Sequence, residues 1–91
     1  MQRKAEGMNR YLVMAMRRPH FDPAIVQPHK DFLEGLRAGG RLELAGGFSD
    51  KTGGAYLMLA HSLDEAVTIA HQDPAHTSGG WDITVYEWQA R

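Results

Sequence analysis

Two side chains that can exchange a proton, His29 and Asp73, fall on expected helix faces that are otherwise apolar. His29 lies on a stripe with Ile25, Leu33 and Leu36, near the amino-terminal end of the first expected helix. Burial and the positive end of a helix both favour neutral imidazole, the form that a general base requires. The alternative is a packed histidine with one hydrogen-bond partner, and the residues alone favour this alternative.

Asp73 lies three residues after Ala70 and seven after Ala66, so it continues the inward face of the second expected helix. A carboxylate at the carboxyl end of a helix meets an unfavourable dipole and needs a compensating partner, such as an imidazole N–H. The alternative is that Asp73 and Pro74 form an ordinary turn that stops the helix. Taken alone, the turn is again the simpler interpretation.

The remaining histidines do not predict a metal site. No two histidines have the i,i+4 spacing of a helical metal site, and neither HxxxH nor HExxH occurs. His71 is expected to complement the end of its helix. His76 follows Asp73 and Pro74 closely and is a candidate for lining the same cavity. We therefore expect no metal and no other cofactor.

Four more residues are candidates for substrate binding. Gly46 and Gly47 are adjacent within an expected strand, which glycine weakens, so either a ligand approaches there or the strand bends. Ser49, just beyond, can donate a hydrogen bond or simply begin a turn. Arg17 ends the first expected strand and could attract an anionic substrate, although solvated surface charge is the more common role.

Six short elements would position these residues, in the order β-α-β-β-α-β. The apolar run at residues 11–16 (YLVMAM) predicts a central strand. Asp22 and Pro23 predict a helix start, with Asp22 as the N-cap. Pro28 predicts one separate turn before it and the helix body after it, and the glycine pair at 39–40 predicts the helix end.

Alternating patterns predict three more strands, with a hairpin turn between the first two. The strands are expected at residues 41–49, 55–61 and 81–88, and the turn at residues 50–54. In the strand at 41–49, the side chains of Leu42, Leu44 and Phe48 are expected on one face. Ser62 and Glu65 form a capping box that opens the second helix.

Right-handed crossovers turn this order into an antiparallel sheet with both helices on one face, the ferredoxin-like arrangement of the α+β class. The other face is then uncovered. The first strand nevertheless has two apolar sides, with Leu12, Met14 and Met16 opposite Tyr11, Val13 and Ala15. Because a large uncovered apolar patch usually marks an interface, we expect a homodimer formed sheet to sheet.

The composition limits the function classes. At 91 residues the chain is expected to form one domain over residues 10–91, after a polar, disordered segment at residues 1–9. A net charge of −1 gives no basic excess for nucleic acid or an anionic membrane, and no run approaches the ~18 apolar residues of a membrane span. The absence of cysteine excludes disulfides and thiolate chemistry, which fits a reducing cytoplasm.

From the first expected strand to its end, the sequence resembles the YciI-like family, also called the YCII-related or DGPF-associated family. The matching pieces are, in order, QPHKDFLEGLRAGGRLELAG, GGFSDKTGGAYLML, SLDEAVTIAHQDP and WDITVYEW. Each motif is weak alone, and their order and spacing make the match specific. The chain has Gly46 and Gly47 where members often have a Gly-Pro pair, a departure that affects the shape of the pocket.

The resemblance implies a ferredoxin-like fold that dimerises into an α/β-barrel-type assembly. It also implies an active site built from a histidine and an aspartate, which correspond to His29 and Asp73. Some members take part in the breakdown of chlorinated aromatics, removing chloride from a hydroxylated ring. Substrate choice does not follow from the fold and the two residues alone.

Two classes of function stay open. In the first, the chain is a cofactor-independent lyase or isomerase, including dehydrochlorinase-like chemistry, acting on a small cyclic or phenolic metabolite. His29 would remove a proton while Asp73 fixes its tautomer. In the second, the dimer is a non-catalytic small-molecule-binding or accessory protein, and the pair is a structural hydrogen bond. An oxygen-using monooxygenase of similar dimeric barrel fold shares the architecture only.

Overall fold

The computed structural model describes residues 7–90, so residues 1–6 of the expected polar segment lie outside the described part of the chain. The elements follow the order β1 (Asn9–Arg17), η1 (Pro23–Ile25), α1 (Val26–Ala38), β2 (Leu42–Gly47), β3 (Gly53–Ala60), α2 (Leu63–Ala70), α3 (Pro74–Thr77) and β4 (Trp81–Glu87). The expected β-α-β-β-α-β order is thus confirmed, with two short helical turns added. Within residues 7–90, no helix is long and apolar enough to cross a membrane.

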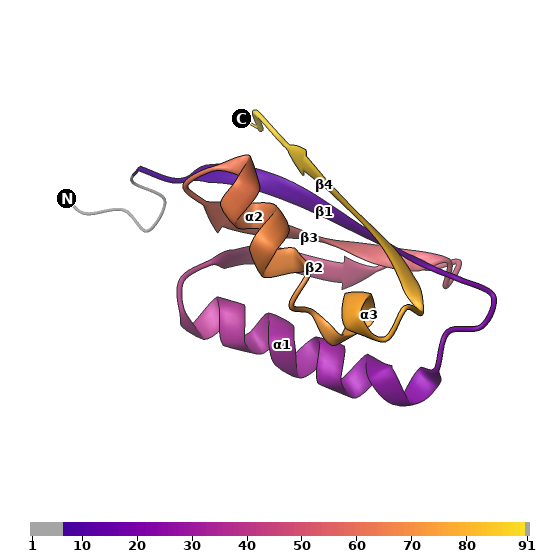
Figure 1. The fold of residues 1–91 in the computed structure, drawn as a ribbon. Helices are drawn as coiled ribbons and strands as arrows, with labels where there is room; N and C mark the ends of the chain where they lie inside the picture. The colour runs from indigo at the N-terminus through magenta and orange to yellow at the C-terminus, as the bar shows by residue number, and fades with distance from the viewer. Residues whose placement is uncertain (1–6, 91) are drawn as a thin grey trace.

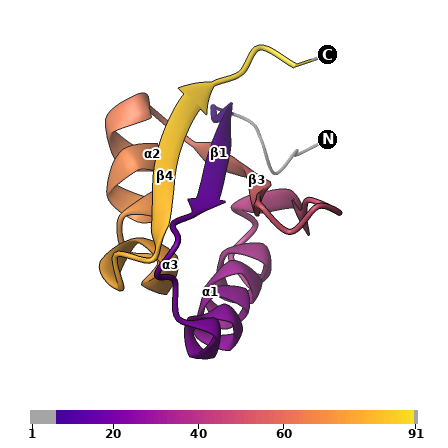
Figure 2. The same cartoon turned by 90° about the vertical axis from the view of Figure 1, so that its right-hand side faces the viewer.

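The four strands form one antiparallel sheet in the order β2-β3-β1-β4, with β1 and β3 at its centre (Figure 1). The core lies between this sheet and the helices, where Leu33 of α1 and Ala66 of α2 pack with Val13 of β1. Turned by 90°, the ribbon shows the helices gathered on one side of the strands (Figure 2). This is the ferredoxin-like α+β fold that the sequence predicts.

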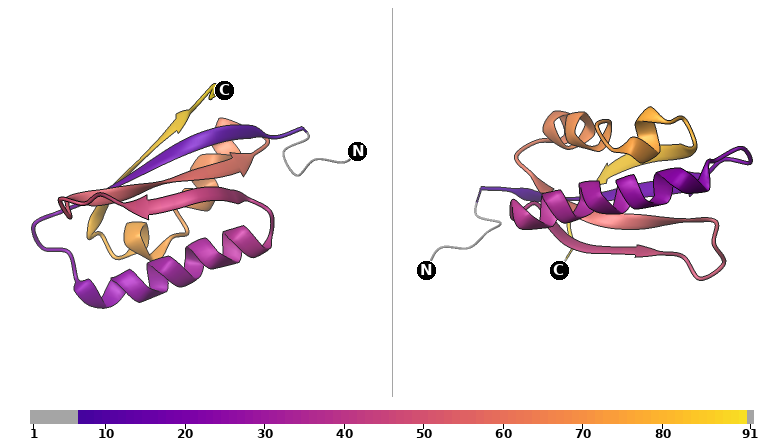
Figure 3. Two further views of the ribbon diagram at one scale, coloured as in Figure 1. Left: turned by 180° about the vertical axis from the view of Figure 1, so that it is seen from behind. Right: turned by 90° about the horizontal axis from the view of Figure 1, so that it is seen from below.

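The two apolar sides of β1 have different environments. Tyr11, Val13 and Ala15 are buried beneath the helices, whereas the side chains between them are only half-buried. Seen from behind, the strands lie in front and no described helix crosses them (Figure 3). The sheet therefore has an inner face, which carries the core, and an outer face, which no described element covers.

The first helix begins as expected at Asp22, but Pro28 does not interrupt it. The Asp22 carboxylate accepts a hydrogen bond from the Ala24 N–H at 2.9 Å, and Pro23 is the first residue of η1. α1 then starts at Val26, which makes Pro28 its third residue. The prediction of a helix body beginning after Pro28 was wrong, because a proline in the first turn lacks only an N–H that would be unpaired in any case.

β2 differs from its predicted alternation. Leu42 pairs with Met58 whereas Leu44 pairs with Leu57, so β2 carries one extra residue, a β-bulge, between them. The extra residue moves Leu44 to the outer face, where it is 69 % exposed, while Leu42 stays in the core at 7 %. The expected common face for these two leucines was therefore wrong, since a bulge is invisible in an apolar–polar pattern.

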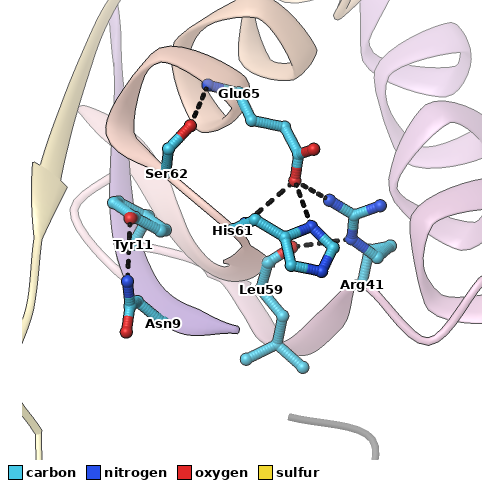
Figure 4. A network of polar contacts seen from close by, with 7 residues as sticks. All are labelled: Asn9, Tyr11, Arg41, Leu59, His61, Ser62 and Glu65. Carbon is cyan, nitrogen blue, oxygen red and sulfur yellow. Dashed lines mark hydrogen bonds and ion pairs between the residues drawn. The ribbon is translucent and has the colours of Figure 1, made fainter. Parts of the chain in front are cut away.

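A polar network closes the start of α2 (Figure 4). The Ser62 hydroxyl accepts a hydrogen bond from the Glu65 N–H at 3.1 Å, as the capping box predicts. The Glu65 carboxylate accepts a second bond from the backbone N–H of His61 at 2.9 Å and pairs with the Arg41 guanidinium. Arg41 also donates to the Leu59 carbonyl at 2.8 Å, so α2 is tied to the end of β3.

Candidate active site

His29 and Asp73 meet in the folded chain although 44 residues separate them. The Nδ1 atom of His29 lies 2.9 Å from one carboxylate oxygen of Asp73 and 2.8 Å from the other. Asp73 is fully buried, while 19 % of the His29 side chain is exposed. The pair therefore joins a carboxylate in the protein interior to an imidazole that still reaches solvent.

Asp73 is positioned by the short helix that follows it, not by α2. α2 ends at Ala70, and Asp73 is the N-cap of α3, where its carboxylate accepts a hydrogen bond from the Ala75 N–H at 2.9 Å. A carboxylate is favoured at this end of a helix because the N–H groups there point toward it. The expected unfavourable dipole is thus absent, although the expected imidazole partner is present.

The contact determines which His29 nitrogen can act. A carboxylate accepts hydrogen bonds, so its partner Nδ1 carries the proton and Nε2 keeps its lone pair in the neutral ring. Among the described residues Nε2 has no hydrogen-bond partner. An imidazole held in this way can accept a proton at Nε2 from a bound molecule.

A cavity of about 460 Å³ lies beside His29, between α1 and the inner face of the sheet. Small residues make its floor: Ala15 from β1, Ala45 and Gly47 from β2, and Gly54 from β3. Residues of α1 and the Trp81 side chain form its walls. The volume is in the usual range for a site that holds a small molecule.

The glycines of this hairpin have separate roles. A Cβ at Gly54 would lie 2.5 Å from the Gly46 carbonyl oxygen, so glycine there lets β2 and β3 approach each other. At Gly47 a Cβ would meet a single atom, 3.8 Å away, and at Gly46 none within 4 Å. The register irregularity of β2 is at Leu44, not at the glycines. Gly47 pairs with Gly54 on the inner face, so a side chain there would take up cavity space, whereas Gly46 pairs with Ala55 on the outer face. The alternative of space for a ligand is therefore supported at Gly47.

Arg17 also lines the cavity. Its guanidinium carbon lies 4.6 Å from the centre of the Phe21 ring, and one terminal nitrogen donates to the Lys51 carbonyl at 3.3 Å. Its Nε is buried and has no hydrogen-bond partner among the described residues. The candidate anion-attracting residue thus contributes to the wall of the cavity that contains His29.

His76 and Ser49, the other two candidates, do not line this cavity. α3 directs the His76 ring against His71, where the two imidazoles stack at 4.0 Å. Ser49 lies in the turn beyond the end of β2. His76 was expected to line the cavity of His29 and does not line it in the single chain, because a helical turn carries its ring to His71. The hydrogen bond expected from Ser49 stays a prediction.

Two aromatic residues that the sequence did not single out for the site lie beside His29. The Trp81 ring is nearly parallel to the imidazole, at 20° and 6.3 Å between centres. The Tyr56 ring is also 6.3 Å from it, on a residue only 2 % exposed. Both aromatic rings line the cavity, and an alternating strand pattern does not show which aromatic side chains face a cavity.

The hydroxyl of Tyr56 is in an unusual environment. Burial first, and then the nearby Asp73 carboxylate, raise the pKa of Tyr56 well above its ordinary value. No hydrogen bond of ordinary geometry joins the hydroxyl to Asp73 or to any other described residue. Tyr56 therefore stays protonated, and its hydroxyl can donate a hydrogen bond.

The described residues contain no cluster of three or more histidine, cysteine or acidic side chains arranged to hold a metal ion. The dyad pairs one histidine with one carboxylate, and the Asp73 oxygens are already taken by Nδ1 and the Ala75 N–H. The groups available for chemistry in this cavity include the imidazole, the Tyr56 hydroxyl and the Arg17 guanidinium. The charged residues of α1 that also line it are Lys30, Asp31, Glu34 and Arg37.

Comparison with known proteins gives a family match, a sequence relative and several solved structures. Residues 9–89 match the model of the YCII-related domain. The uncharacterised protein YjpA of Bacillus subtilis (strain 168) is 44 % identical over 84 residues, which cover 92 % of this chain and 99 % of YjpA.

Among solved structures, the 5-chloro-2-hydroxyhydroquinone dehydrochlorinase TftG of Burkholderia phenoliruptrix AC1100, in complex with 2,5-dihydroxybenzoquinone, matches with a TM-score of 0.71. The two chains are 24 % identical, and the match covers 90 % of this chain and 95 % of TftG. A dimeric protein of unknown function and ferredoxin-like fold from Bacteroides fragilis NCTC 9343 matches at a TM-score of 0.49 and 17 % identity, over 90 % and 97 % of the two chains. The TftG match shows that the fold is shared.

Proposed function

The chain belongs to the YCII-related domain family, and from this premise we propose that it is a cofactor-independent enzyme whose catalytic dyad is His29 and Asp73. The reaction is a proton transfer of the lyase or isomerase type on a small cyclic or phenolic metabolite. The observation that carries the proposal is the contact of His29 Nδ1 with both oxygens of a fully buried carboxylate, at the edge of a cavity.

In the proposed mechanism His29 Nε2 takes a proton from an sp³ carbon beside a carbonyl, which a hydroxylated ring has in its keto tautomer. The electrons of that C–H bond form a new C=C double bond as a leaving group departs from the adjacent carbon. In an isomerisation, the double bond shifts instead and the imidazolium returns the proton to another carbon. Asp73 holds the Nδ1 proton and stabilises the imidazolium that forms. Proton transfer of this kind contributes typically ~10² to 10⁴ in rate.

The cavity supports a small, flat substrate. Its floor of alanine and glycine leaves room above the sheet, and the Trp81 ring gives one apolar wall. The relative TftG is named as a dehydrochlorinase and as a complex with 2,5-dihydroxybenzoquinone, which is a small, flat ring. We therefore propose a hydroxylated ring as the first substrate class to test, with Arg17, Gly46 and Gly47 among the residues that contact it.

The active form proposed here is a homodimer in the cytoplasm, with residues 10–91 as its folded domain. On the outer face, Leu12 pairs with Leu57 on one side and with Tyr86 on the other, and Leu44 extends the same row. Leu44 and Tyr86 are exposed in the single chain. A second copy facing this row would remove it from water.

Replacement of His29 tests the mechanism. His29→Ala should abolish turnover of 5-chloro-2-hydroxyhydroquinone, or of another hydroxylated ring found by screening, because it removes the base that the buried Asp73 carboxylate orients. Chloride release and ring absorbance measure the reaction, and circular dichroism measures the melting temperature. His76→Ala, a histidine outside the cavity, is the matched control and should keep full turnover. Turnover that survives in His29→Ala would refute the dyad.

A non-catalytic binding protein is the second candidate, because the pair also joins α1 to the cap of α3. In that case removal of either partner would lower the melting temperature, and no substrate would be turned over. Titration of His29 by NMR, with and without Asp73→Asn, separates the two. A catalytic base should titrate and respond to a bound ligand, whereas a structural histidine should do neither.

A further inference from the structure

Two buried polar side-chain atoms in the described residues have no hydrogen-bond partner, and both belong to residues of one cavity. They are Arg17 Nε and the Tyr56 hydroxyl oxygen. The cavity that both residues line is the one that contains His29. Folded proteins satisfy the large majority of their buried polar groups, so each exception requires an explanation.

A missing partner is informative here because both atoms are hydrogen-bond donors. A buried donor left without an acceptor loses its hydration and gains nothing in return. A bound molecule that presents acceptor oxygens would satisfy both atoms. Such a molecule also explains why a tyrosine occupies position 56, where phenylalanine would fill the same core without an unpaired hydroxyl.

Arg17 also differs from the other arginines in its charge partner. Each of the others in the described range forms an ion pair with a carboxylate: Arg10, Arg18, Arg37 and Arg41. Arg17 forms none there; the Phe21 ring and the Lys51 carbonyl hold its guanidinium. Its positive charge in the cavity wall thus lacks a negative partner among the described residues.

We propose that Tyr56 and Arg17 form a subsite for an anionic oxygen on a planar carbon of the substrate. The oxygen belongs to a phenolate, an enolate or a carboxylate, and it binds beside His29. This subsite deepens the proposed function and rests on it, since removal of a proton by His29 next to a carbonyl creates such an oxygen. The Tyr56 hydroxyl would donate a hydrogen bond to that oxygen, and Arg17 would supply the opposite charge.

The subsite is tested by binding, without turnover. Calorimetry would measure the affinity of 4-nitrophenolate and of benzoate, each beside a neutral analogue, 4-nitroanisole and benzamide. Tyr56→Phe and Arg17→Met should each weaken the two anions about 10- to 100-fold, the usual worth of a hydrogen bond to a charged group. The neutral analogues should bind the variants as they bind the natural chain.

Two controls remove the same groups outside the cavity. Tyr11→Phe deletes the hydroxyl of another buried tyrosine on the neighbouring strand, which has Asn9 as its partner. Arg18→Met deletes an adjacent arginine that pairs with Asp82. Neither change should alter the affinity for the anions. Preference for one anion over the other identifies the oxygen as phenolate or carboxylate.

Stability gives an independent readout. Because its hydroxyl is unpaired, Tyr56→Phe should leave the melting temperature unchanged or raise it. A lower melting temperature of Tyr56→Phe would show that the hydroxyl has a partner within the protein. If Tyr56→Phe and Arg17→Met bind both anions as tightly as the natural chain does, no subsite exists. Either result overturns the proposal. If the anions need Tyr56 but turnover survives in His29→Ala, the subsite stands and the dyad mechanism fails.

Discussion

Asp73 has two hydrogen-bonding tasks, and one substitution separates them. Its carboxylate caps α3 through the Ala75 N–H and holds the Nδ1 proton of His29. Asparagine is an equally good N-cap, so it retains the first task. It lacks the negative charge and presents an N–H as well as an oxygen, so it does not hold the imidazole in the same protonation pattern.

Asp73→Asn should therefore lower kcat about 10²- to 10⁴-fold with little change in KM, because proton transfer suffers and the cavity keeps its shape. Steady-state kinetics with the substrate found for the natural chain measure the effect. The matched control is Asp22→Asn, which makes the same change at the N-cap of η1 and should keep kcat. An unchanged kcat in Asp73→Asn would assign Asp73 to the helix cap alone.

At the scale of elements, the start of α2 depends on one carboxylate. The backbone N–H of His61 in the first place, and the Arg41 guanidinium as well, hold the pKa of Glu65 below its usual value of 4.5. A carboxyl group with a lowered pKa stabilises the fold at pH values above its unfolded pKa. That contribution is lost as the pH falls through the folded pKa, when the group becomes protonated.

Glu65→Gln should consequently lower the melting temperature at neutral pH, and the difference from the natural chain should vanish in acid below the Glu65 pKa. Thermal melts recorded across this pH range measure it. Glu34→Gln is the control, since it removes the same charge from an exposed pair with Arg37 on α1 and should change little. A difference that persists in acid would mean that Glu65 acts through packing, not charge.

At the scale of the whole molecule, the sheet has a second apolar surface that no helix within residues 7–90 covers. The outer side chains of β1 are half-buried, and Leu44, Tyr86 and Trp88 are exposed. Leu12 lies at the centre of this surface, between Leu57 and Tyr86. The proposed homodimer places this leucine in the middle of its interface.

Leu12→Glu should raise the dissociation constant of the dimer at least about 100-fold, because it buries an unpaired charge in the interface. Light scattering coupled to size-exclusion chromatography measures the mass, and circular dichroism verifies the fold. Thr68→Glu adds the same charge on an exposed position of α2 and should leave the dimer intact. A natural chain that is monomeric at all concentrations would contradict the interface.

The sequence by itself determined the elements and their order. Asp22 and Ser62 cap helices because their side chains bond to backbone groups two and three residues away. The two apolar sides of β1 are visible because strand side chains alternate. Such signals lie within a few residues of chain, so the ferredoxin-like order followed from them, and the family resemblance agreed.

Only the tertiary structure decided which residues share the cavity. His29 and Asp73 come from elements 44 residues apart, and their contact depends on how α1 packs beside α3. The bulge before Leu44, the position of His76 outside the cavity and the unpaired hydroxyl of Tyr56 have no local signature. Caps and periodicity are fixed by neighbours in the chain, whereas a site is fixed by neighbours in space.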